Sequence, residues 1–115
     1  MEYIKSGFNP LYSEEAPTLE QVSELRGVTL LEFGAPWCGH CEEATPAIKA
    51  AISEQDDLSH IKIYDGKGKL LGRQFKVKLW PTVILLQNGE EVDRVVRPVE
   101  TDEVRQLIAK ADINN

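Results

Sequence analysis

The two cysteines of the chain stand three positions apart in the run Trp37-Cys38-Gly39-His40-Cys41, between an apolar stretch and a segment with helical periodicity. Two thiols at this spacing can close a small disulfide ring when they occupy the first turn of a helix. The unpaired N–H groups and the positive end of the helix dipole favour a thiolate there. The thiolate is the form that attacks disulfides. We therefore interpret the run as a redox-active dithiol.

Composition limits the chain to one compact domain. Its 115 residues, 42% of them hydrophobic and 28% charged, suffice for a single core and leave no room for a second. The net charge of −6 argues against binding to nucleic acid or to an anionic membrane. Residues 1–17 lack the apolar core of a secretory signal, so we expect a cytoplasmic protein, although a chain trimmed of its signal would look the same. In the cytosol a lone Cys-x-x-Cys is more often catalytic than structural.

The first half of the chain predicts an arm followed by a strand and a helix. Residues 1–17 are expected to form an arm or a short edge strand, and residues 18–112 the domain. The run 28–33 is nearly continuously apolar, which is typical of a central strand buried on both faces. Helical spacing then extends from Cys38 to about residue 55, and Pro46 should kink that helix.

The second half predicts further strands and helices. A strand over 60–64 and a short helix over 70–75 precede a strand over 81–86, which the Asn88-Gly89 hairpin signal joins to a strand over 91–96. Thr101 is expected to cap a final amphipathic helix. This order of elements predicts the α/β class, with a central mixed β-sheet flanked by helices on both faces.

Four features together resemble the thioredoxin family over roughly residues 18–112. They are the Trp-Cys-Gly-His-Cys run after the central strand, Pro46 five residues past the second cysteine, the run Trp80-Pro81-Thr82 that opens the third strand, and the Asn-Gly hairpin. A bare Cys-x-x-Cys is a weak signal, whereas these four features at consistent spacing form a specific one. The resemblance implies a thioredoxin fold and a thiol–disulfide oxidoreductase that acts on protein disulfides.

The resemblance also implies roles for residues around the dithiol. Cys38 would be the exposed nucleophile and Cys41 the more buried resolving thiol. Pro81 would follow a cis peptide bond and hold the Trp80 backbone where an extended substrate can pair with it; the alternative is that Pro81 simply begins an edge strand in trans. Trp37 and Trp80 would form an apolar rim around the reacting sulfur, or merely pack.

Glu32 lies within the apolar strand, where an unpaired carboxylate is costly. Burial should raise its pKa, which would suit it to proton transfer. The matching family position holds an acid proposed to deprotonate the buried cysteine. The alternative is a carboxylate that reaches solvent at the strand end. His60 could pair with Glu32, or Lys62 could serve instead.

Four residues depart from the usual thioredoxin pattern. His40 stands where thioredoxins usually carry Pro, and Glu32 where they usually carry Asp; both resemble the protein disulfide isomerase version. A protonated imidazole beside Cys38 would stabilise the thiolate and make the pair more oxidising. Gly34 replaces a large aromatic residue, which should leave the site more open. Arg97 occupies a loop that usually contains Gly, so we expect altered partner choice, toward acidic partners.

The expected partners are disulfide-containing protein substrates and a recycling reductase or glutathione, with the chain acting as a monomer. No nucleic acid, membrane or bound cofactor is expected. No metal is expected either, because structural zinc takes four ligands and the chain offers only two histidines beyond its cysteines. The alternative to an enzyme is a non-enzymatic thioredoxin-like binding module whose acidic surface docks a partner. The reductive direction and the oxidative or isomerising direction both remain open at this point.

Overall fold

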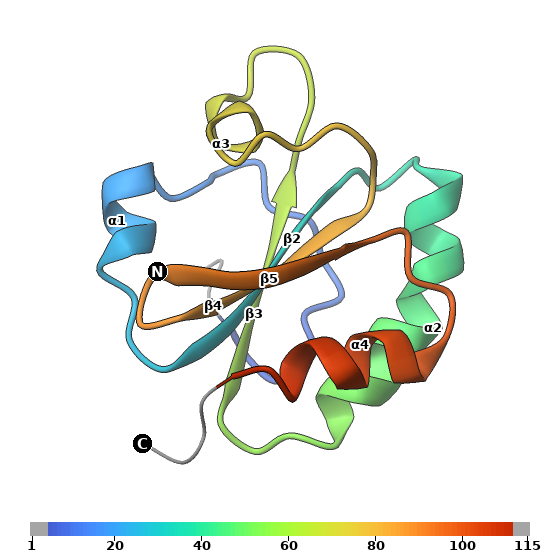
Figure 1. Ribbon diagram of the computed structural model, residues 1–115. Helices are drawn as coiled ribbons and strands as arrows, with labels where there is room; N and C mark the ends of the chain where they lie inside the picture. Colours follow the sequence, from blue (N-terminus) through green and yellow to red (C-terminus); the bar gives the residue numbers. More distant parts are fainter. Residues whose placement is uncertain (1–4, 112–115) are drawn as a thin grey trace.

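The computed structural model describes residues 5–111, which form a five-stranded sheet with helices on both faces (Figure 1). The expected α/β class and mixed sheet are confirmed. In chain order the elements are β1 (Lys5–Ser6), α1 (Leu19–Ser23), β2 (Val28–Gly34), α2 (Gly39–Ser53), β3 (Leu58–Tyr64), α3 (Leu70–Gln74), β4 (Thr82–Gln87), β5 (Glu90–Val96) and α4 (Thr101–Ile108).

The apolar strand β2 lies at the centre of the sheet. The strand order is β1-β3-β2-β4-β5, with β2 parallel to β3 and antiparallel to β4. Because β2 and β3 are parallel, they end at the same edge of the sheet, where Gly34 pairs with Tyr64. The dithiol follows directly after β2 and therefore lies at this edge.

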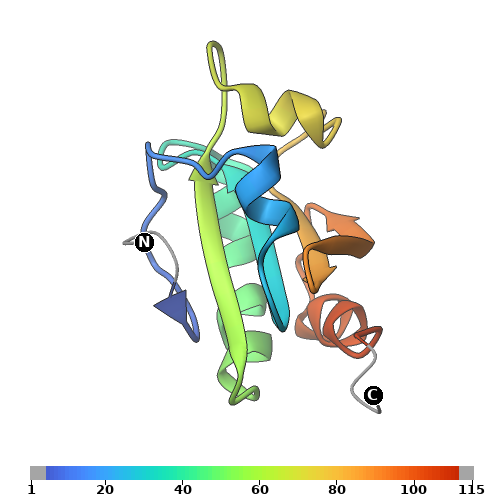
Figure 2. The same cartoon turned by 90° about the vertical axis from the view of Figure 1, so that its left-hand side faces the viewer.

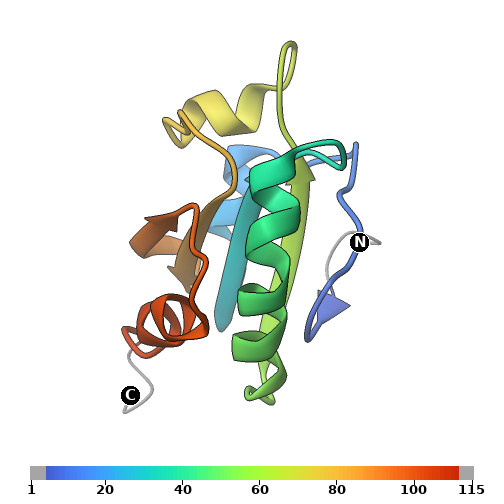
Figure 3. The ribbon, with the colours of Figure 1, turned by 90° about the vertical axis from the view of Figure 1, so that its right-hand side faces the viewer.

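Two separate apolar clusters cover the two faces of the sheet. Helices α2 and α4 pack on one face, as Figure 3 shows, and α1 and α3 lie on the other, as Figure 2 shows. Alternate residues of each buried strand serve opposite faces, since neighbouring side chains in a strand point to opposite sides. The first cluster includes Leu30, Ile48, Ile52, Leu85 and Leu107, and the second includes Val22, Leu31, Phe33, Ile61 and Leu71.

Some expected boundaries differ from the structure. β3 begins at Leu58, two residues earlier than the alternation indicates. The N-cap of α4 is Glu100 and not Thr101, so that prediction was wrong. The physical reason is the Glu103 carboxylate, which accepts the backbone N–H groups of Val99 and Glu100 at 3.0 Å each. Helix α2 continues through Pro46 to Ser53 as one element.

The segment between β1 and α1 runs along the outer edge of β3 (Figures 2 and 3). The Ser13 backbone donates to the Lys62 carbonyl and accepts from the Tyr64 N–H, both at 2.9 Å. This pairing brings Asn9 and Tyr12 into hydrogen-bond contact with side chains of β3 and β2. The N-terminal segment therefore becomes part of the site described next.

Candidate functional site

The dithiol occupies the start of α2. Cys38 is the N-cap residue, with an extended backbone (φ −84°, ψ 117°), and its sulfur accepts the Cys41 backbone N–H at 3.2 Å. The sulfur thus takes the position that a Ser or Asp oxygen usually takes at a helix N-terminus. Both cysteines are free thiols. Cys38 is 7% exposed and Cys41 2%, so Cys38 is the more accessible sulfur, but it is far less open than expected.

Glu32 is fully enclosed and its carboxylate is well supplied with donors. The Tyr12 hydroxyl donates to its Oε2 at 2.6 Å, and His60 Nε2 lies 2.9 Å from its Oε1. Burial alone would raise its pKa, but these two hydrogen bonds and the nearby Lys62 ammonium outweigh burial and lower the pKa. The expected raised pKa was therefore wrong, as was the alternative of a carboxylate that reaches solvent.

His60 pairs directly with Glu32, while the Lys62 ammonium donates to a backbone carbonyl. The backbone N–H of Asn9 donates to His60 Nδ1 at 2.9 Å, so Nδ1 carries no proton and the ring proton sits on Nε2, where it faces Glu32. The Lys62 ammonium donates to the Pro10 carbonyl at 3.2 Å and lies 4.1 Å from the centre of the Tyr12 ring. Both side chains are candidates from the sequence, and in the structure His60 makes the contact with Glu32.

Tyr12 is a site residue that no pattern in the sequence indicates. A Cβ atom added to Gly34 would stand 2.6 Å from the Tyr12 hydroxyl oxygen and 2.7 Å from the Cys41 sulfur. Both groups therefore use the space that a side chain at position 34 would need. The expectation that Gly34 leaves the site more open was wrong, because Tyr12 fills the gap.

The Cys41 thiol is held protonated in this environment. Burial, and secondarily a hydrogen bond with Cys38, raise its pKa to about 11, although the contact with the Tyr12 hydroxyl acts in the opposite direction. Burial and the neighbouring Glu32 carboxylate raise the pKa of Tyr12, so this side chain stays a neutral phenol. Cys41 therefore needs a proton acceptor before it can act as a nucleophile.

The loop before β4 brings Trp80, Pro81 and Arg97 together. The Trp80–Pro81 peptide bond is cis, as expected. Arg97 adopts a left-handed backbone (φ 52°), and its Nε donates to the Trp80 carbonyl at 2.8 Å. This carbonyl is one of the backbone groups expected to face a substrate. Arg97 therefore already supplies it with a hydrogen-bond donor from within the chain. The Trp80 indole N–H donates to Asp65 at 2.9 Å, which fixes the ring.

Two expected site residues lie on the surface beside Cys38. Trp37 is 65% exposed, and its ring centre lies 5.4 Å from that of Trp80 in an edge-on contact. The Trp37 indole N–H donates to the Tyr64 hydroxyl at 3.1 Å. His40 is exposed in the first turn of α2. The two tryptophans thus form an exposed apolar rim near the dithiol.

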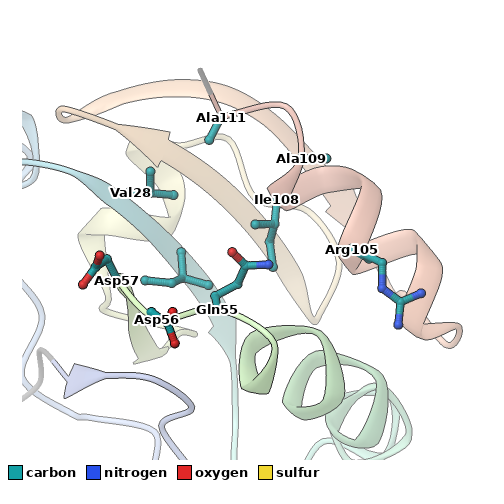
Figure 4. Close-up of a pocket in the computed structure, with 9 residues that line it drawn as sticks. Val28, Gln55, Asp56, Asp57, Arg105, Ile108, Ala109 and Ala111 are labelled. Carbon is teal, nitrogen blue, oxygen red and sulfur yellow. The ribbon is translucent and has the colours of Figure 1, made fainter. Parts of the chain in front are cut away.

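A separate hollow lies at the opposite end of the sheet, between the end of α2, the start of β3 and α4 (Figure 4). Its cation, Arg105, already pairs with Glu54 at 2.7 Å and with Asp102.

Among residues 5–111, no three His, Cys, Asp or Glu side chains gather so that they could hold a metal ion. None of the helices that the structure describes has the length and apolar character needed to cross a membrane.

Comparisons with known proteins agree with this geometry. Residues 12–110 match the family model described as Thioredoxin. The solved structure of reduced thioredoxin 2 from Pseudomonas aeruginosa is 43% identical, with a TM-score of 0.77, over 87% of this chain and 96% of that one. Thioredoxin from Chlamydia trachomatis is 33% identical over 73% of this chain and 82% of its own length. A protein disulfide-isomerase from Datisca glomerata is 29% identical over 80% of this chain, which corresponds to 22% of that protein.

Proposed function

This chain belongs to the thioredoxin family, and from that premise we propose that it is a thiol–disulfide oxidoreductase acting on protein disulfides through the dithiol Cys38-Gly39-His40-Cys41. One observation carries the proposal: the Cys38 sulfur caps a 15-residue helix and accepts the Cys41 N–H at 3.2 Å. A negative sulfur is favoured at that position by the helix dipole and by the donated hydrogen bond.

In the reductive direction the reaction has two exchange steps. The Cys38 thiolate attacks one sulfur of a substrate disulfide, and the other substrate sulfur leaves as a thiolate. The Cys41 sulfur, once deprotonated, attacks the Cys38 sulfur of this mixed disulfide and releases the second substrate thiolate. The substrate disulfide gains two electrons, and the two cysteines lose them as their own disulfide forms.

Each remaining site residue has a proposed part in this scheme. Glu32 is the acceptor for the proton of Cys41, because its carboxylate is buried and accepts the Tyr12 hydroxyl, which also contacts Cys41. Trp37 and Trp80 form the rim against which an apolar substrate segment packs, and Pro81 shapes the backbone beside it. Arg97 supplies a positive charge at this rim, which favours substrates with acidic residues near their disulfide.

His40 bears on the direction of electron flow. A protonated imidazole two residues after Cys38 would stabilise the reduced, thiolate form of Cys38, and stabilising the reduced form makes the disulfide a better oxidant. We therefore propose a more oxidising pair than a Gly-Pro version would give. The variant His40→Pro should shift the reduction potential, measured against a glutathione series, about 30 mV or more toward negative values.

The proposed protein works as a monomer without a bound cofactor and is recycled by a reductase or by glutathione. Residues 18–112 are proposed as the domain. The preceding arm, residues 1–17, contributes Tyr12 to the site.

The activity can be tested by reduction of insulin with dithiothreitol as the final reductant. The unaltered protein should accelerate the reaction, and Cys38→Ala should abolish the acceleration. Cys41→Ser should accumulate a stoichiometric mixed disulfide, because the first exchange proceeds and the second does not. Partner binding that survives loss of both cysteines, without any acceleration by the unaltered protein, would favour the non-enzymatic binding module instead.

A further inference from the structure

The Tyr12 hydroxyl stands between the resolving cysteine and the buried carboxylate. It donates to Glu32 Oε2 at 2.6 Å, and it shares the space above Gly34 with the Cys41 sulfur. The Ser13 backbone is paired with β3 next to it, and the Lys62 ammonium lies 4.1 Å from the centre of its ring. The hydroxyl is therefore held in place by the anchored backbone beside it and by the cation over its ring.

The other carboxylate oxygen is already engaged. Because Asn9 donates to His60 Nδ1, the ring proton on Nε2 points to Glu32 Oε1, 2.9 Å away. This hydrogen bond fixes the carboxylate. The free oxygen, Oε2, accepts the Tyr12 hydroxyl and is therefore linked to the dithiol through Tyr12. A proton that leaves Cys41 for Glu32 thus meets the Tyr12 oxygen on its way.

We propose that the Tyr12 hydroxyl relays the proton from Cys41 to Glu32 during resolution of the mixed disulfide, an inference that rests on the proposed function. The Cys41 S–H gives its proton to the Tyr12 oxygen while the Tyr12 O–H gives its own to Glu32 Oε2. The products are a Cys41 thiolate, an unchanged phenol and a neutral Glu32. The thiolate electron pair then forms the bond to Cys38, and the substrate sulfur leaves with the electrons of the broken bond.

A phenol is suited to this position because it can accept and donate at the same oxygen. Its raised pKa means that it passes the proton without itself becoming an anion. The resting carboxylate holds its donors tightly, so the Cys41 thiolate is short-lived, and formation of the Cys41–Cys38 bond consumes it before the proton returns. A cleft lined in part by Tyr12, Thr45 and Lys62 also reaches Cys41.

The relay can be tested with the chromogenic disulfide dithiobis(nitrobenzoate), which separates the two exchanges. Attack by Cys38 releases one coloured thiolate, and resolution by Cys41 releases the second. In Tyr12→Phe the first phase should keep its rate while the second slows about 100-fold at neutral pH. The slowing should shrink as the pH approaches about 11, where Cys41 loses its proton without help.

Several ionisable side chains surround the Tyr12 hydroxyl and contribute to the pH dependence of the second phase. Glu32 faces the Tyr12 hydroxyl from β2, His60 and Lys62 face this cluster from β3, and the two cysteines face it from α2. The matched control is Thr45→Val, which removes another hydroxyl from the same cleft, one that donates to the Cys41 carbonyl at 2.8 Å. Both phases should be unchanged in that variant.

A double variant separates the relay from simple packing. If Tyr12 acts through Glu32, adding Tyr12→Phe to Glu32→Gln should slow the second phase no further than Glu32→Gln alone. A second phase in Tyr12→Phe within about twofold of the unaltered rate, or slowing factors that multiply in the double variant, would overturn the relay and leave water in the cleft as the carrier. Absence of a fast first phase in the unaltered protein would instead refute the proposed function.

Discussion

Replacing Gly34 by alanine tests whether Tyr12 fills the space beside Cys41. The added methyl group would stand 2.6 Å from the Tyr12 oxygen, 2.7 Å from the Cys41 sulfur and 2.9 Å from the Tyr12 ring carbon that bears the hydroxyl. Such contacts cannot persist, so the tyrosine or the helix start must move. Overpacking of this kind costs about 2 kcal/mol, which at a slope of about 2 kcal/mol per molar lowers the urea midpoint by about 1 M.

Urea denaturation followed by circular dichroism measures this loss. The matched control is Gly39→Ala at the first residue of α2, where an added Cβ meets nothing within 4 Å. That variant should keep or slightly raise the free energy of unfolding, since Ala favours helix over Gly by about 1 kcal/mol. The Gly34→Ala penalty should also be smaller in a Tyr12→Phe background, which lacks the nearest atom. A Gly34→Ala variant as stable as the unaltered protein would refute the placement of Tyr12.

Two further predictions concern Glu32 and Arg97. Because the pKa of Glu32 is lower in the folded than in the unfolded chain, its contribution to stability is fully present above the unfolded value of about 4.5 and is lost as the pH falls through the folded value. Glu32→Gln should therefore flatten the dependence of the unfolding free energy on pH in the acid range; a slope equal to that of the unaltered protein would contradict the assignment. Arg97→Gly relieves the backbone strain at φ 52° and removes the guanidinium from the Trp80 carbonyl. It should therefore lower KM for extended peptide disulfides, whereas the control Arg94→Ala on β5 should leave KM unchanged. Equal KM values in all three proteins would refute a role for this loop in substrate binding.

The features predicted from sequence were those encoded by neighbouring residues. A continuous apolar run is enough to indicate β2, because a strand buried on both faces needs no alternation. The start of α2 follows from its own spacing, and Asn88-Gly89 marks the hairpin between β4 and β5. The cis bond before Pro81 came from the family resemblance rather than from any local pattern.

The features missed depend on contacts between distant parts of the chain. Tyr12 meets Glu32 across 20 positions, and Asn9 meets His60 across 51. The segment that carries Tyr12 and Asn9 has no periodicity of its own. Its position is set by backbone pairing with the edge of β3, which local sequence does not encode. The direction of the Glu32 pKa was wrong for the same reason: burial can be expected from an apolar strand, but its hydrogen-bond donors come from elsewhere in the chain.

The rate at which Cys38 reacts with iodoacetamide at neutral pH measures most directly whether the helix start activates this sulfur. We expect Cys38 in the reduced protein to be alkylated at least about tenfold faster than a thiol in an unstructured peptide of the same local sequence, with Cys41 reacting far more slowly. A Cys38 rate no higher than that of the peptide would contradict the account.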